Sequence, residues 1–240
     1  MKDFQKTIEI AEDRKGGAAA LKSLLPRALS AKELAKIPDH RFLAMMTRGI
    51  FNAGFAWKVI DVKWPDFETV FLGFDPLRLA ALSPEVWEGF GSDKRVVRNM
   101  QKILAVKENV FFMLEIAEEY GSFAKFIAQW PSDDLVGLLS FLKKRGSRLG
   151  GMTGQYFLRR MGKDSFLLSR DVTQALRNAG VDVPEIVSSK RDLKLVQETF
   201  NKWHQETGLS YSNLSRVLGY SAGINHEHVR LQSEMKRFAL

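Results

Sequence analysis

A glycine-rich turn surrounded by cations is the part of this chain whose residue types are best suited to binding an anion. The turn has the sequence RLGGMTG over residues 148–154 and leads into an amphipathic helical pattern. Glycines let backbone N–H groups approach a partner closely, and a helix that begins there adds unpaired N–H groups and the positive end of its dipole. The surrounding cations are Lys143, Lys144, Arg145 and Arg148. We expect a contact with a nucleic-acid phosphate, the alternative being a plain connection between two helices.

The charge balance of the chain agrees with an anionic partner. Of its 240 residues, 36 are Lys or Arg and 28 are Asp or Glu, which gives a net charge of +8 and an isoelectric point near 9.6. Basic proteins of this kind associate with nucleic acid. The sequence has no Cys, which excludes disulfides, thiol nucleophiles and Cys-ligated metals, and its four His are scattered at positions 40, 204, 226 and 228. We expect no bound metal and no cofactor.

Composition and hydropathy also set the class of the chain. A hydrophobic content of 45% with mixed charge excludes a disordered chain, and 240 residues suffice for one domain or two closely packed lobes. No apolar run reaches membrane-spanning length, and the N-terminus MKDFQKTIEIAEDRK has no signal-peptide core. We expect a cytoplasmic protein that does not contact membranes, and we expect it to be a monomer.

Hydrophobic periodicity predicts an all-α fold, because strand-like alternation is scarce. Ser30 and Glu33 form a capping box, and Ser83 followed by Pro84 is typical of an N-cap with proline in the first turn. Residues 221–240 are expected to form a mobile tail. The expected helical segments are 1–14, 18–25, 31–36, 41–62, 64–73, from 84 onward, 96–120, 135–144, 152–161, 171–178, and one or two helices within 191–219.

Several short motifs follow one another in a recognisable order. They are NAGFAW at 52–57, FDP at 74–76, VRNMQKI at 97–103, GSF at 121–123 and LKKRG at 142–146, followed by Gly151, Thr153 and Tyr156. As an ordered set they resemble the DNA-3-methyladenine glycosylase I family over about residues 42–180. The resemblance implies the all-α, two-lobed helical bundle of the helix-hairpin-helix DNA glycosylase superfamily, with the glycine-rich turn as its hairpin. It also implies hydrolysis of the N-glycosidic bond of an alkylated adenine in DNA.

The chain departs from this family at several functional positions. Family members carry a zinc site of two Cys and two His, and here Asp171 and Ala175 stand where the C-terminal His and Cys would fall. The Glu that reads the base falls on Gly49, and the Gln three residues later is Asn52. Residues 1–40 do not align, so the N-terminal pocket Tyr of the family has no counterpart.

The resemblance places a flipped base among Phe51, Asn52, Trp57 and Tyr156. An enzyme that acts on a base must take it out of the stack and hold it between flat or apolar groups, and a cationic base is attracted further by an aromatic face. Trp57 is the first choice for that face, with a core position as its alternative. Asn52 would hydrogen-bond the Watson–Crick edge or a backbone group, and Tyr156 would line the pocket or pack in the core.

In many members of the superfamily, an Asp shortly after the hairpin stabilises the sugar cation, and the resemblance places that position at Ser169. Asp171, two residues beyond, is therefore the catalytic candidate, with the N-cap of a helix beginning at Val172 as its alternative. Arg98 and Lys102 match a basic family segment and would touch the backbone, brace the fold or stay at the surface. The predicted DNA contacts are Lys144, Arg145, Arg148, Gly150, Gly151 and Thr153.

The leading hypothesis is a monofunctional glycosylase that removes 3-methyladenine or a related alkylated base from double-stranded DNA. No Lys stands at the post-hairpin position that lyase-type relatives use, so the strand would stay uncut. The alternative is a DNA-binding protein on the same fold without catalysis. A transcription regulator that uses 210–219 has less support, since a packing helix explains that segment. We expect one domain over 1–220, made of N-terminal helices (1–40), a family-matching core (41–190) and C-terminal helices (191–220).

Overall fold

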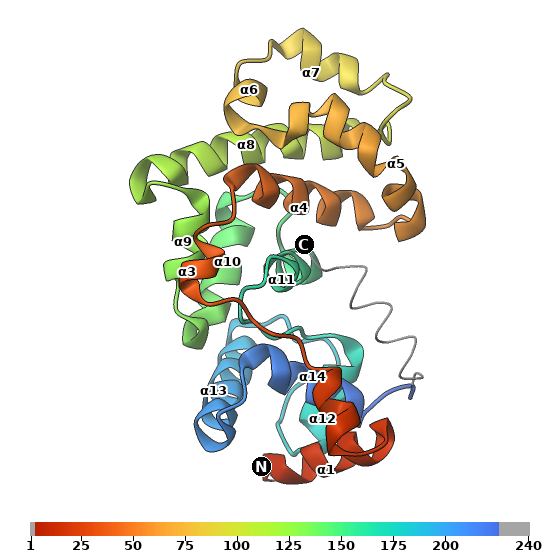
Figure 1. Cartoon of the computed structure of the whole chain (residues 1–240), viewed down its shortest axis with the longest axis vertical. Helices are drawn as coiled ribbons and strands as arrows, with labels where there is room; N and C mark the ends of the chain where they lie inside the picture. Colours follow the sequence, from red (N-terminus) through yellow and green to blue (C-terminus); the bar gives the residue numbers. More distant parts are fainter. Residues whose placement is uncertain (1–2, 226–240) are drawn as a thin grey trace. The chain divides into compact units, whose positions relative to one another are not determined.

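The computed structural model describes residues 3–225, and every regular element in this range is a helix, as the periodicity predicts. Contacts divide the chain into two compact units (Figure 1). Unit 1 is made of 1–29, 131–137 and 158–240, and unit 2 of 30–130 and 138–157. His226, His228 and most of the predicted tail lie outside the described residues. No helix within 3–225 is both long enough and apolar enough to cross a membrane.

Unit 2 is built around a long helix that four shorter ones contact. α8 packs against α4, α6, α7 and α9, and the aromatic rings of Phe42, Phe123 and Phe157 meet in the core, edge to face. The helices of this unit are α3 (Ala31–Leu34), α4 (Asp39–Asn52), α5 (Trp57–Val70), η1 (Leu72–Phe74), α6 (Pro76–Ala80), α7 (Pro84–Phe90), α8 (Met100–Tyr120) and α9 (Phe123–Gln129), with most of α10 (Leu135–Arg145) and α11 (Gly151–Arg160).

Unit 1 joins the two ends of the described chain. Its helices are α1 (Phe4–Lys15), α2 (Ala18–Ser23), η2 (Ser132–Asp134), α12 (Arg170–Asn178), α13 (Lys190–Thr207) and α14 (Tyr211–Ser221). α14 contacts both α1 and α12, so the N-terminal and C-terminal helices lie side by side (Figure 1). Phe4 packs on Trp203 with ring centroids 4.8 Å apart, and Phe166 stacks on Phe200 at 4.4 Å. Aromatic packing therefore ties 3–15 to the helices that follow residue 190.

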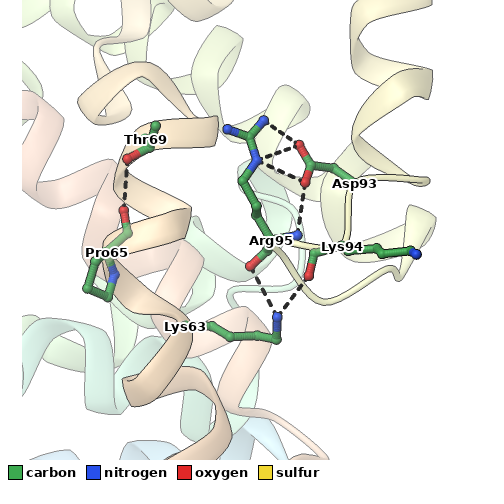
Figure 2. Close-up of polar contacts among 6 residues, drawn as sticks. All are labelled: Lys63, Pro65, Thr69, Asp93, Lys94 and Arg95. Atoms are coloured by element: carbon green, nitrogen blue, oxygen red, sulfur yellow. Dashed lines mark hydrogen bonds and ion pairs between the residues drawn. The ribbon is translucent and has the colours of Figure 1, made fainter.

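The expectation of one helix over 41–62 and another beginning at Trp64 is wrong. α4 ends at Asn52, the chain turns through Gly54 (φ 77°), and α5 begins at Trp57 and continues through Pro65. Proline lacks an N–H and costs an interior hydrogen bond, which is why the sequence favoured a boundary there. Packing opposes that cost, because the Trp64 ring stacks on Phe67 at 5.6 Å and on Phe74 at 5.4 Å. Thr69 donates to the Pro65 carbonyl at 3.1 Å (Figure 2).

The helix expected from Val96 begins at Met100 instead, because Asn99 is its N-cap and accepts from the Lys102 N–H. Side chains hold the preceding loop in a non-helical path (Figure 2). The Arg95 guanidinium pairs with the Asp93 carboxylate at 2.6 Å, and Lys63 of α5 donates to the Lys94 carbonyl at 2.8 Å. These local bonds fix the chain where it enters α8.

Candidate functional site

The turn between α4 and α5 carries the predicted base-binding residues on unit 2. Asn52 ends α4 and Trp57 begins α5, so the NAGFAW motif is a helix–turn–helix connection rather than the middle of one helix. The four residues between them are exposed, and two aromatic side chains are presented to solvent, Phe55 with 41% and Trp57 with 37% of its surface exposed. Trp57 is therefore not a core residue.

The turn lies against the second helix of the hairpin. The Tyr156 ring of α11 meets the Trp57 ring edge to face, with centroids 5.9 Å apart at 85°. A Cβ added to Gly49 would stand 3.3 Å from Cγ2 of Thr153, also on α11. Trp57 therefore adjoins α11, the helix that follows the predicted DNA-binding turn. A side chain at position 49 would need Thr153 to shift by a few tenths of an ångström.

Asn52 offers a hydrogen-bond acceptor that the described residues leave unused. Its side chain is only 5% exposed, and Oδ1 has no donor within the described part of the chain. A buried polar atom without a partner is costly, so this unpaired oxygen is a candidate contact for a ligand. The alternative of a structural bond from this oxygen to the backbone finds no support here. Phe51, in contrast, is fully buried with its ring edge-on to Phe67 at 4.8 Å, so it supports the surface from behind.

Lys102 of α8 braces the turn from below, which decides between its predicted roles. Its side chain is buried, and the ammonium donates to the carbonyls of Ala53 (2.6 Å) and Phe51 (3.2 Å). It also lies 4.6 Å from the centre of the Phe55 ring. Burial, followed by repulsion from Arg148, lowers the pKa of Lys102 below its usual 10.5. Arg98 is exposed, so only Lys102 of this pair holds the fold. Phe55, exposed over the ammonium, is a further candidate site residue, which the sequence motif gave no reason to single out.

The hairpin turn itself is shaped by a buried amide and by positive φ angles. Asn109 is fully buried in α8, donates to the Ser147 carbonyl (3.0 Å) and accepts from the Ser147 N–H (2.8 Å). Arg148 and Gly151 both have positive φ, 57° and 58°. A Cβ at Gly154 would overlap the Leu149 carbonyl oxygen, so the sequence RLGGMTG requires glycine there for close approach.

The cations of the turn are presented to solvent, as an electrostatic partner requires. Lys144, Arg145 and Arg148 are all exposed. Arg145 forms an ion pair with Glu115 at 2.7 Å, and Arg148 donates to Gln101 at 2.8 Å. Exposed pairs of this kind exchange readily for a phosphate, because each contributes little in water.

Asp171 lies in unit 1, in the first turn of α12, and its predicted role as an N-cap is wrong. The cap is Ser169, whose hydroxyl accepts from the Val172 N–H at 3.3 Å. The Asp171 carboxylate is half-buried and faces Gly223, where an added Cβ would overlap it. With capping supplied by Ser169, the carboxylate of Asp171 remains available for other chemistry.

Within residues 3–225 no three His, Asp or Glu side chains are grouped so that they could hold a metal ion. The first and last helices of the described chain, α1 and α14, pack directly on each other. We predict that elemental analysis of tag-free protein finds no stoichiometric zinc, since the sequence has no thiolate ligand. Zinc at one equivalent per chain would contradict this prediction.

Comparison with protein families identifies the central part of the chain. Residues 35–136 match the methyladenine glycosylase family. Over this stretch the predicted family resemblance is confirmed. The match contains the whole turn from Asn52 to Trp57 together with Lys102. The hairpin and Asp171 follow it in the chain, so their assignments rest on geometry and on the sequence motifs.

Solved structures of methyladenine glycosylases and of a wider relative resemble this chain. A 3-methyladenine DNA glycosylase I is 25% identical, over 52% of this chain and 79% of its own, with a TM-score of 0.45. The Staphylococcus aureus protein is 23% identical, over 52% and 77%, with a TM-score of 0.47. The 8-oxoguanine glycosylase/lyase of Methanocaldococcus jannaschii, in complex with DNA, is 14% identical over 89% and 95%, with a TM-score of 0.52, which supports the fold. No curated protein sequence matches the chain.

Proposed function

We propose that this protein is a DNA repair glycosylase that flips an alkylated adenine out of the duplex and hydrolyses its N-glycosidic bond. The observation that carries the proposal is the juxtaposition of the exposed Trp57 ring, the Tyr156 ring and the unpartnered Asn52 acceptor beside the hairpin. A flipped base needs a flat face and a group that reads its edge, and these residues supply both. The family match of residues 35–136 supports the same activity.

Recognition of the base follows from the chemistry of these side chains. Alkylation at N3 makes the adenine cationic, so the π face of Trp57 attracts it more strongly than an uncharged base. The Asn52 Oδ1 is an acceptor and suits the exocyclic amino group of adenine, which is a donor. Because position 49 carries no carboxylate, specificity rests on Trp57 and Asn52.

Phe55 lies where its side chain could fill the gap that a flipped base leaves in the duplex. Its exposed ring projects from the same turn as Trp57 and is held over the Lys102 ammonium. Apolar side chains inserted between base steps stabilise kinked DNA. We assign Phe55 to this wedge role, with Lys102 fixing the turn that presents it.

Cleavage of the bond between base and sugar requires a negative charge near the sugar more than it requires a proton donor. The alkylated base is already a good leaving group, so the enzyme must mainly stabilise the oxocarbenium-like sugar, and Asp171 is the proposed carboxylate. No Lys stands at the post-hairpin position that lyase-type relatives use. The proposed reaction is therefore hydrolysis alone, which leaves an abasic site. The proposal includes action as a monomer in the cytoplasm, without a cofactor.

The nature of the product tests this reaction. Methylated duplex DNA treated with the protein should acquire abasic sites that break only after alkali, in excess over untreated DNA at the same temperature. Breaks that appear without alkali would contradict the monofunctional assignment. Absence of alkali-labile sites would overturn the glycosylase proposal in favour of the alternative, a DNA-binding protein without catalysis, for which the missing carboxylate at Gly49 is the supporting observation.

Phosphate contact at the hairpin predicts a second result. The double variant Gly150→Ala/Gly151→Ala should bind duplex DNA more weakly, because a Cβ at Gly150 would press on Lys143 and Gly151 has φ +58°. Affinity of the wild type should also fall steeply with salt, by a slope of about one per phosphate contact. Gel-shift titrations at several salt concentrations measure both. Unchanged affinity in the double variant would show that the turn only connects two helices and does not contact phosphate. Gly73→Ala, at another positive-φ glycine of unit 2 with open space around it, is the matched control.

A further inference from the structure

We propose that α1, α14 and the segment 222–225 form a support that positions the Asp171 carboxylate, with Arg14 and Gly223 as its positioning residues. This inference rests on the proposed function, because the carboxylate is placed there to stabilise the sugar cation. All of these elements belong to unit 1. They lie outside 35–136, the part of the chain that matches the family. The support gives a role to α1 and α14, the first and last helices of the described chain.

Arg14 at the end of α1 clamps the chain that follows α14. Its Nε donates to the Tyr220 carbonyl at 2.8 Å, and its Nη2 donates to the Gly223 carbonyl at 2.7 Å and to the Ala222 carbonyl at 3.4 Å. Asn225 closes the clamp, because its Nδ2 donates to the Arg14 carbonyl at 2.9 Å. Charge-assisted bonds from one guanidinium to three carbonyls within residues 220–223 fix the path of this segment. The predicted mobile tail is thus anchored as far as Asn225.

The clamp places Gly223 directly on the Asp171 carboxylate. An added Cβ at Gly223 would overlap both oxygens, so no residue with a side chain fits while the carboxylate keeps its place. Gly223 also has φ +66°, which favours glycine. Within residues 3–225 the Asp171 carboxylate forms no hydrogen bond or ion pair. The Gly223 backbone therefore limits where the Asp171 carboxylate can lie, without forming a hydrogen bond to it.

Two serines of α14 fix the chain that leads into α12. The Ser212 hydroxyl accepts from the Ser165 N–H (3.1 Å) and donates to the Ser165 carbonyl (3.1 Å). The Ser215 hydroxyl does the same for Leu167, at 2.9 and 3.2 Å. Each buried serine thus satisfies both backbone groups of one residue in an extended segment. The segment ends at Ser169, the N-cap of α12. The bonds from α14 therefore fix the position of the first turn of α12, which carries Asp171.

The support can be tested through binding alone, without relying on turnover. The probes are two duplexes, one with a cationic pyrrolidine abasic analogue that resembles the charged sugar and one with the neutral tetrahydrofuran analogue. A positioned carboxylate should give the wild type a preference of about tenfold or more for the pyrrolidine duplex. Asp171→Asn, Gly223→Ala and Arg14→Gln should each reduce that ratio toward one. Gly208→Ala is the matched control, since Gly208 has φ +69° in the same unit with nothing within 4 Å of an added Cβ. It should keep the wild-type ratio.

The outcomes separate this inference from the proposed function. If the ratio falls in Asp171→Asn but Gly223→Ala and Arg14→Gln behave like Gly208→Ala, the support is overturned and the glycosylase proposal stands. If Asp171→Asn leaves the ratio unchanged, Asp171 does not face the sugar and the inference fails as well. If the ratios fall as expected but no base is released from methylated DNA, the support is upheld and the glycosylase proposal fails. The melting temperature of each variant shows whether a reduced affinity ratio reflects unfolding. An unfolded variant loses affinity for both duplexes equally, and that result would overturn the inference.

Discussion

Replacing Trp57 with alanine should remove most base excision while the fold and the binding of undamaged duplex persist. The side chain is 37% exposed at the start of α5, so its loss leaves no core cavity. Stacking of one base on an aromatic ring contributes roughly 1–3 kcal/mol, and a cationic base adds to this. The rate of excision under single-turnover conditions should therefore fall at least about tenfold. A gel shift with undamaged DNA and a thermal melt, run on the same preparation, measure the functions that should survive.

Trp87→Ala is the matched control for Trp57→Ala. Trp87 is 1% exposed and packs between Phe71 and Phe90. Its truncation should cost roughly 3–5 kcal/mol of folding free energy and lower every activity together. If Trp57→Ala melts as early as Trp87→Ala and loses duplex binding in proportion, Trp57 is structural and the base-binding assignment is wrong.

Lys102→Met should reduce excision strongly with little loss of stability. The substitution removes two bonds from the ammonium to the carbonyls of Phe51 and Ala53, so the turn that carries Phe55 and Trp57 loses its brace. The cost of burying a charge disappears at the same time, which offsets the lost bonds in the free energy of unfolding. A hydrogen bond from a charged group contributes about 1.5 kcal/mol. If the loss of one such bond raises the activation free energy by this amount, the rate of excision falls about tenfold. Lys107→Met, on the same helix, should leave excision unchanged.

The pH dependence of stability gives an independent check on Lys102. Burial is the main cause that lowers its folded-state pKa below 10.5, the value expected in the unfolded chain. Between these two pH values the unfolded state binds more protons, so the contribution of Lys102 to stability rises with pH in that window. Below the folded-state pKa the amine is charged in both states, and this contribution is constant. The free energy of unfolding of wild type minus that of Lys102→Met should therefore increase as pH rises toward 10.5. A flat difference would contradict burial of this ammonium.

Local signals in the sequence were sufficient for the all-helical class, for several helix caps and for the hairpin. Ser30 and Glu33 form the expected capping box, and the glycine-rich turn joins two helices as predicted. Caps and close-approach glycines act within a few residues, so their physics can be read directly from spacing. The break after Asn52 was missed, because alanine and phenylalanine on both sides of Gly54 continue an apolar pattern that suits a helix.

Long-range contacts were beyond reach from the sequence, since no local pattern encodes them. Nothing near Lys102 indicates that its ammonium reaches the carbonyls at the end of α4, about fifty positions earlier. The contact between Gly223 and the Asp171 carboxylate also joins residues far apart in the sequence. The position of Gly223 depends in turn on a hydrogen bond from Arg14, near the N-terminus. Proline propensity gave a wrong helix boundary at Pro65, since α5 continues through it and Trp64 stacks on Phe67.

The most direct test of the glycosylase proposal is the rate at which free methylated adenine leaves methylated duplex DNA. Chromatography of the ethanol-soluble fraction separates the released bases and identifies 3-methyladenine. The wild-type protein should release it well above the heat-depurination background measured at the same temperature, and Trp57→Ala should release far less. Release at the background rate, by a protein that still binds the duplex with a steep salt dependence, would contradict the account and leave a DNA-binding protein without catalysis.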